Sequence, residues 1–276
     1  MTPSMRRTRR THRTLRVAGA GAAALLALTA CSSSGSGSHS GSAGSGSSSS
    51  KPSGDVTVFA AASLKESFTT LGKEFEKQHP GAKVTLSFGG SDSLAAGITG
   101  GAPADVFASA SPKTMKIVTD GGDNATAPVT FVRNQLEIAT LPGNPDHVAS
   151  LKDLTRSGLK VVLCDRTVPC GAAAQKALAA GGLKLTPVSY EQDVKAALNK
   201  VVLKEADAAV VYRTDVKAAG GKVQGVDFPE SAEAVNDYPI TLLKNSNNPG
   251  AAKAFIAFVR SDEGQKVLSE AGFRRP

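Results

Sequence analysis

Short apolar runs alternate with helical patterns along the chain from Asp55 to its end. Strand patterns fall near residues 56–60, 83–88, 104–108, 128–133, 135–140, 159–163, 207–211, 223–228 and 238–243. Helical patterns occupy 63–79, 91–99, a segment from 111, and 150–156, 171–180, 190–204, 213–219, 249–260 and 262–271. Because strands that alternate with helices pack in layers around largely parallel sheets, this order predicts an α/β fold.

The sequence between residues 55 and 276 contains no stretch with the composition of a linker. A structure with two lobes therefore requires the chain to cross between them more than once. We place the crossings near 133–137 and 235–240. This division predicts one lobe from 55–134 plus 238–276 and a second lobe from 135–237.

Residues 1–30 have the pattern of a signal peptide, with six arginines, no acidic residue, and a short apolar run at 17–28. That run is too short for a stable membrane span. The segment ends in Leu28-Thr29-Ala30-Cys31, which resembles the bacterial lipobox and predicts lipidation of Cys31. The alternative is ordinary cleavage that leaves the Cys31 thiol free. The Arg6-Arg7 pair leaves the Sec and twin-arginine export routes both open.

The segment from 31 to 54 predicts a lipidated cysteine followed by a tether. From Ser32 to Ser50, every residue except His39 and Ala43 is Ser or Gly, and such a segment cannot bury apolar surface. Its reach is roughly 25 Å. We therefore expect the protein to be exported and anchored to the outer face of the cell membrane.

The net charge of +8 does not indicate a nucleic-acid-binding protein. Without the six arginines of the signal peptide, the chain carries 26 basic and 24 acidic residues. A nearly neutral protein lacks the positive surface that phosphate backbones require, so we expect no nucleic-acid partner.

Two cysteines remain in the folded part, Cys164 and Cys170. In an exported protein, two cysteines so close in sequence most simply form a local disulfide. A metal-binding pair is the weaker interpretation, because His79 and His147 have no ligand-type spacing to each other or to the cysteines.

Two serines follow the ends of predicted strands, each after small residues and each at a predicted helix start. Ser63 follows Ala60-Ala61-Ala62, and Ser91 follows Gly89-Gly90. The structural interpretation is a Ser63/Glu66 capping box in the first case and a tight turn with a serine N-cap in the second. The functional interpretation is that both serines, with free N–H groups of the helix starts, face a bound anion at the carboxyl edge of one sheet.

Tyr212 ends the apolar strand at 207–211, directly before a helix. It is either a boundary tyrosine with its ring in the core or a hydroxyl donor. Neutral donors at helix starts suit a fully deprotonated oxyanion, because a protonated anion would find no acceptor for its hydrogen.

The chain shows no convincing set of catalytic residues. It lacks a Walker-type phosphate loop and a Gly-x-Ser-x-Gly elbow in the folded part. Ser157 and Lys160 match the Ser-x-x-Lys pattern of penicillin-recognising enzymes, but the companion Ser-Asp-Asn and Lys-Thr-Gly elements are missing. We therefore expect a protein that is not an enzyme, and a cell-surface serine hydrolase is the remote alternative.

Four segments resemble the molybdate-binding proteins of ABC importers, in the same order along the chain. They are Thr57–Leu64 (TVFAAASL), Ser87–Ala110 (SFGGSDSLAAGITGGAPADVFASA), Val168–Leu178 (VPCGAAAQKAL) and Asp193–Asp215, which ends AAVVYRTD. The resemblance spans essentially all of 55–276, and AAASL and GAPAD are its most specific parts. It implies the type II periplasmic-binding-protein fold, with two lobes, each a mostly parallel sheet flanked by helices, and a hinge between them.

The resemblance also implies the ligand contacts. In the family, two serines of one lobe and two backbone amides and a tyrosine hydroxyl of the other hold the oxyanion. By motif these fall on Ser63, Ser91, Cys170, Val194 and Tyr212.

Three features depart from the family pattern. Cys170 stands where the family often has Ala, so a disulfide to Cys164 would stiffen the loop and keep the Cys170 N–H. Asp92 brings a negative charge near the site, so we expect its side chain to point away. Arg166 would add a positive charge if it reached the site.

The resulting hypothesis is a lipid-anchored, monomeric solute-binding protein for molybdate and tungstate. It would need no cofactor, and molybdenum would enter only as the bound oxyanion. Its partners would be the permease and ATPase subunits of an ABC importer. The alternatives are a carrier for another solute such as sulfate, phosphate or ferric ion, and a scaffold or adhesion lipoprotein whose cleft binds nothing.

Overall fold

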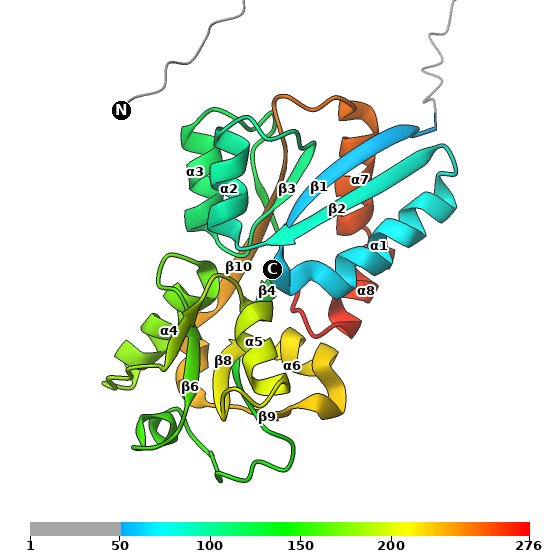
Figure 1. Ribbon diagram of the computed structural model, residues 1–276. Coiled ribbons are helices and arrows are strands. Elements are labelled where there is room, and N and C mark those ends of the chain that lie inside the picture. The colour runs from blue at the N-terminus through cyan, green and yellow to red at the C-terminus, as the bar shows by residue number, and fades with distance from the viewer. Residues whose placement is uncertain (1–50) are drawn as a thin grey trace, which may run out of the picture. The chain divides into compact units, whose positions relative to one another are not determined.

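The computed structural model describes residues 51–276, and within them the chain forms ten strands and eight α-helices (Figure 1). The strands are β1 (Gly54–Ala61), β2 (Ala82–Gly89), β3 (Val106–Ala108), β4 (Val129–Asn134), β5 (Leu136–Thr140), β6 (Val161–Cys164), β7 (Ser189–Glu191), β8 (Ala208–Tyr212), β9 (Gln224–Val226) and β10 (Asn236–Leu242). The helices are α1 (Lys65–Gln78), α2 (Ser91–Thr99), α3 (Pro112–Asp120), α4 (Pro169–Ala180), α5 (Val194–Val202), α6 (Arg213–Ala219), α7 (Pro249–Arg260) and α8 (Asp262–Glu270). The predicted signal peptide at 1–30, the lipidation site at Cys31 and most of the tether lie outside the described residues.

The strands form two five-stranded sheets. The first has the order β2-β1-β3-β10-β4 and the second the order β7-β6-β8-β5-β9. In the first sheet β1 is parallel to β2 and β3, and β10 is antiparallel to β3 and β4. In the second, β6 is parallel to β7 and β8, and β5 is antiparallel to β8 and β9.

The expected α/β architecture with two mostly parallel sheets is therefore confirmed, and in each sheet one strand runs against the others. The reason lies in how the chain passes between the sheets. β5 follows β4 after one residue, and β10 follows the last turn of the second sheet. A strand that starts at the side of a sheet where the neighbouring strands end must run antiparallel to those neighbours. The two strands that receive the chain, β5 and β10, are accordingly the antiparallel ones.

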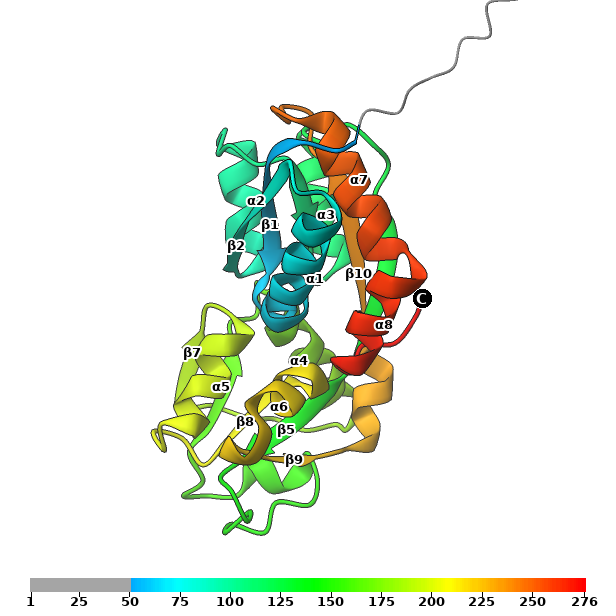
Figure 2. The same ribbon diagram turned by 90° about the vertical axis from the view of Figure 1, so that its right-hand side faces the viewer.

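The first sheet buries apolar side chains on both faces, because successive residues of a strand point to opposite sides. Val56, Val58 and Ala60 of β1 pack with α1, α7 and α8, and the neighbouring Phe59 packs on the opposite face, with α2 and α3. Figure 2 shows α1, α7 and α8 side by side along the sheet. Phe75 of α1 meets Phe255 of α7 edge-on, with ring centroids 5.4 Å apart.

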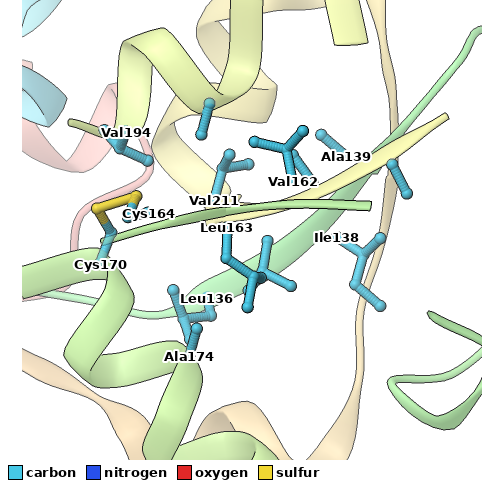
Figure 3. Packing of buried hydrophobic residues seen from close by; sticks show 14 of the residues in the cluster. Leu136, Ile138, Ala139, Val162, Leu163, Cys164, Cys170, Ala174, Val194 and Val211 are labelled. Atoms are coloured by element: carbon cyan, nitrogen blue, oxygen red, sulfur yellow. A yellow bond between two sulfur atoms is a disulfide. The ribbon is translucent and has the colours of Figure 1, made fainter. Parts of the chain in front are cut away.

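The second sheet has its own core, formed by β5, β6 and β8 with α4 and α5. Figure 3 shows Leu136, Val162 and Val211 in this core, with the Cys164–Cys170 disulfide at its edge. All five residues of β8 are buried. A strand buried on both faces reads as a continuous apolar run, which is why the sequence identified it.

Two local expectations were wrong. The helix expected at 190–204 begins only at Val194, because Ser189–Glu191 form strand β7 beside β6. The helix expected at 150–156 is a short 3₁₀ turn, Lys152–Thr155. Ser189–Glu191 and Lys152–Thr155 are each too short for the spacing of their apolar residues to distinguish an α-helix from a strand or a 3₁₀ turn.

Candidate functional site

A small cavity lies where the strand ends of both sheets meet. All five residues predicted to contact a ligand line it. The complete lining is Ala61, Ala62, Ser63, Gly89, Gly90, Ser91, Ala110, Val168, Pro169, Cys170, Asp193, Val194 and Tyr212.

Ser63 reaches the cavity from the 3₁₀ turn Ala62–Leu64, which joins β1 to α1. The capping-box interpretation is wrong, because α1 begins at Lys65 and no side chain caps it. The Ser63 hydroxyl instead lies 2.9 Å from the hydroxyl of Tyr238 on β10. Glu66, the expected partner in the box, forms an ion pair with Lys195 at 2.8 Å.

Ser91 is the first residue of α2, and Gly90 takes the N-cap position expected for the serine. The Ser91 side chain is buried, and its oxygen accepts a hydrogen bond of 3.0 Å from the Ala110 N–H. The hydroxyl hydrogen of Ser91 therefore remains available for a ligand.

Gly90 allows the turn before α2 and the turn before α5 to approach each other at the cavity. A Cβ atom built on Gly90 would lie 2.6 Å from the carbonyl oxygen of Gln192, which belongs to the second sheet's side. Real Cβ atoms do not come so close to a backbone oxygen. Only glycine permits this contact, which brings the start of α2 next to the start of α5.

Cys170 presents its backbone N–H at the start of α4. The helix begins with Pro169, which has no N–H, and the first i to i−4 bond is the one from Ala172 to Val168, at 2.9 Å. The Cys170 N–H precedes that bond and is free of the helix ladder. The Cys164–Cys170 disulfide ties this turn to the end of β6, with a Cα–Cα distance of 5.8 Å (Figure 3).

Val194 presents the first N–H of α5. Asp193 caps this helix, and its Oδ1 accepts from the N–H of Lys195 at 2.8 Å and of Ala196 at 2.9 Å. The Asp193 carbonyl accepts from Ala197. Among the described residues, Val194 thus has the one N–H of the first turn of α5 without a partner, and Val194 lines the cavity.

Tyr212 ends β8 and is 1% exposed. Its hydroxyl oxygen accepts a hydrogen bond of 2.9 Å from the side-chain amide of Asn236. Burial, the main cause, raises the pKa of Tyr212 above its ordinary value, so the hydroxyl stays protonated. It can therefore donate its hydrogen into the cavity.

The cavity is lined by uncharged donors, with one exception. None of the described residues that line it is a lysine or an arginine, and the single carboxylate, Asp193, is engaged by two N–H groups. Two hydroxyls come from the first sheet's side. Two amides and a hydroxyl come from the second. Such a set stabilises an anion through hydrogen bonds and helix dipoles rather than through opposite charge.

The remaining candidates do not line the cavity. Arg166 is exposed, and its guanidinium lies over the ring of Tyr190 with 6.0 Å to the centroid. Asp92 is not among the lining residues. Ser157 and Lys160 are exposed in a loop before β6, and neither lines the cavity.

Three buried residues beside the cavity escaped the sequence analysis: Asn134, Asn236 and Tyr238. They lie where the chain crosses between the sheets, and Asn134 and Asn236 face each other as partners in β4 and β10. Only their position near the expected crossings could have drawn attention to them.

Among residues 51–276, no helix combines the length and apolar character that crossing a membrane demands. The same residues contain no cluster of three or more histidine, cysteine or acidic side chains placed to hold a metal ion.

Comparison with known proteins gives consistent matches. The family model for bacterial extracellular solute-binding proteins matches residues 56–274. The molybdate-binding protein ModA of Mycobacterium tuberculosis is 43% identical over 221 residues, covering 80% of this chain and 85% of that protein. Among solved structures, the substrate-binding domain of a putative molybdenum ABC transporter from Clostridium difficile is 31% identical, with a TM-score of 0.62, covering 80% of this chain and 99% of that one.

The periplasmic molybdate-binding protein of Azotobacter vinelandii has a TM-score of 0.71 over 80% of this chain and 99% of its own. At 21% identity it supports the fold alone. The family model and the 43% identical relative support family membership as well as the fold, because both span nearly all of the folded part. The chain therefore belongs to the family of bacterial extracellular solute-binding proteins.

Proposed function

We propose that the chain binds molybdate, and also tungstate, outside the cytoplasm and delivers it to the permease and ATPase of an ABC importer. The observation that carries the proposal is the convergence of donors from both sheets on one cavity: the hydroxyls of Ser63, Ser91 and Tyr212 and the N–H groups of Cys170 and Val194.

This donor set matches a tetrahedral dianion. Each oxygen of such an anion accepts two or more hydrogen bonds, and none donates. The contacts come from both sides of the cavity, so all of them are satisfied only when the two sides meet around the ligand. Ligand binding and closure are therefore coupled.

Further parts of the proposal concern the cell surface. A lipid on Cys31 and the Ser/Gly-rich tether would hold the protein at the outer face of the membrane. It would act there as a monomer and as a carrier rather than an enzyme. Labelling with a lipid precursor tests the anchor, because the Cys31→Ala variant should lose the label.

Calorimetric titration of the purified chain with molybdate, tungstate, sulfate and phosphate tests the ligand. We expect tight binding of molybdate and tungstate at one site per chain, and much weaker binding of sulfate and phosphate. Sulfate binding as tight as molybdate binding would overturn the assignment. A chain that binds none of the four would favour a scaffold role.

A further inference from the structure

The cavity hydroxyls of Ser63 and Tyr212 each contact a buried residue that does not line the cavity. Tyr212 accepts from Asn236, and Ser63 contacts Tyr238, which in turn lies 3.3 Å from the amide nitrogen of Asn134. Asn134 and Asn236 are direct partners in the β4–β10 pairing, at the junction of the two sheets. This cross-strand pair of asparagines therefore contacts cavity hydroxyls from both sides: Asn236 contacts Tyr212 directly, and Asn134 contacts Ser63 through Tyr238.

The geometry fixes which atoms of the two asparagines donate. The Asn236 nitrogen lies 2.8 Å from the Ala110 carbonyl oxygen, which can only accept, so the hydrogens of Asn236 point to Ala110 and Tyr212. The Asn134 oxygen accepts from the Gln135 N–H at 3.0 Å, which leaves the Asn134 nitrogen to donate. Turning either amide over would oppose like groups, oxygen to oxygen at Ala110 for Asn236 and N–H to N–H at Gln135 for Asn134.

These fixed donors determine the direction of the hydroxyl hydrogens. Tyr212 receives a hydrogen from Asn236, which leaves its own hydrogen available to the cavity. Tyr238 receives a hydrogen from Asn134, which leaves its own hydrogen to donate to Ser63, and Ser63 can then donate into the cavity. The Ala110 N–H donates to the Ser91 oxygen, which leaves the Ser91 hydrogen available to the cavity.

We propose that Asn134, Asn236 and Tyr238 are positioning residues that hold the cavity hydroxyls as donors and thereby exclude protonated oxyanions. The proposal rests on the function proposed above and explains its selectivity. A monoprotonated dianion such as hydrogen phosphate must donate one hydrogen. Each cavity hydroxyl already accepts a hydrogen and presents its own, so the hydrogen of such an anion meets donors rather than acceptors, and an unmatched buried donor is costly.

Two variants test the proposal without changing a lining residue. Tyr238→Phe removes the donor to Ser63 and keeps the ring, which packs edge-on against Tyr212 and Phe273. Asn236→Asp replaces the donating amide by a carboxylate, to which Tyr212 would give its hydrogen. Tyr190→Phe and Asn199→Asp, both at exposed positions, are the matched controls.

The measurement is the ratio of hydrogen phosphate affinity to molybdate affinity, by calorimetry at mildly alkaline pH. Both ligands are dianions there, so the charge added by Asn236→Asp largely cancels in the ratio. We expect about a tenfold loss of molybdate affinity and about a tenfold rise in the ratio for each variant, and no change for the controls. Thermal unfolding confirms that each variant is folded.

A purely structural role would weaken both ligands equally and leave the ratio unchanged, and that result in the folded variants would overturn the proposal. If the unaltered chain binds molybdate and the variants keep its selectivity, the positioning role alone fails. If the unaltered chain binds no oxyanion, both the proposed function and the positioning role fail.

Discussion

Lys195 on α5 and Glu66 on α1 form an ion pair of 2.8 Å that joins the second sheet's side of the molecule to the first. The same ammonium lies 2.9 Å from the carboxylate of Asp215, which is fully buried. Burial acts to lower the pKa of Lys195, but the attraction of Asp215 and Glu66 outweighs it and the pKa ends above its ordinary value. The Lys195 ammonium therefore stays charged at neutral pH.

Replacing Lys195 by Met should weaken molybdate binding about three- to tenfold and reduce stability by ~2 kcal/mol, because Asp215 would keep a buried charge without its cation. Lys200→Met is the control. Lys200 lies on the same helix and pairs with Glu205 at 2.6 Å without joining the two sides. We expect it to change stability by less than about 0.5 kcal/mol. Calorimetry and thermal unfolding give both quantities, and equal effects of the two substitutions would contradict the bridging role.

Gly90→Ala should keep the two sides of the cavity apart. Its methyl group would meet the Gln192 carbonyl oxygen at 2.6 Å, whereas a methyl group on the neighbouring Gly89 would meet Leu94 at an ordinary 3.7 Å. The φ of Gly90 is −59°, which alanine adopts without strain. We expect Gly90→Ala to lose at least about tenfold in molybdate affinity, ~1.4 kcal/mol, with little change in melting temperature. Titration of both variants decides, and the same affinity in each would refute the steric argument.

Removing a single donor should cost about 1–3 kcal/mol of binding free energy, typical of a hydrogen bond to a charged group. Ser63→Ala, Ser91→Ala and Tyr212→Phe each delete one hydroxyl. Ser93→Ala, at an exposed position in the same turn of α2 as Ser91, should have no effect. Unchanged molybdate affinity in all three donor variants would show that the ligand binds elsewhere.

Glu137 on β5 should make stability depend on pH. Burial, chiefly, and the carboxylate of Asp227 raise the pKa of Glu137 from 4.5 to about 7, against the opposing charge of Arg213. The folded chain thus holds this proton more tightly than the unfolded chain. The resulting stability is complete below about pH 4.5 and is lost as the pH rises through 7.

Because Glu137 is only partly buried, solvent screening reduces this contribution to about 1 kcal/mol. Glu137→Gln should remove the dependence. Urea unfolding at several pH values checks this, and parallel pH profiles for the two chains would disprove it.

The sequence predicted the cavity better than it predicted the contacts behind it. Ser63 and Ser91 each follow a strand end after small residues, and Tyr212 ends a strand directly before a helix, so a local pattern marks them. The partner of Ser63 is Tyr238, which lies 175 residues away along the chain, and no local pattern connects the two. The capping-box interpretation failed for the same reason, since a tertiary hydrogen bond replaced the local one.

The direction of a strand within its sheet could not be predicted from local patterns either. The run at 238–243 predicts a strand, and β10 is one, but nothing in its residues says that it pairs antiparallel with β3 and β4. Its direction follows from the point at which the chain returns to the first sheet, and that is a property of the whole topology.

Asp193 has a consequence for the size of the ligand. Its carboxylate and carbonyl occupy three N–H groups at the start of α5 and leave the one on Val194. A bulky solute, such as a sugar phosphate or a peptide, would find no second N–H group on that wall. A side chain with the same sign of charge as the cargo thus helps to keep larger solutes out.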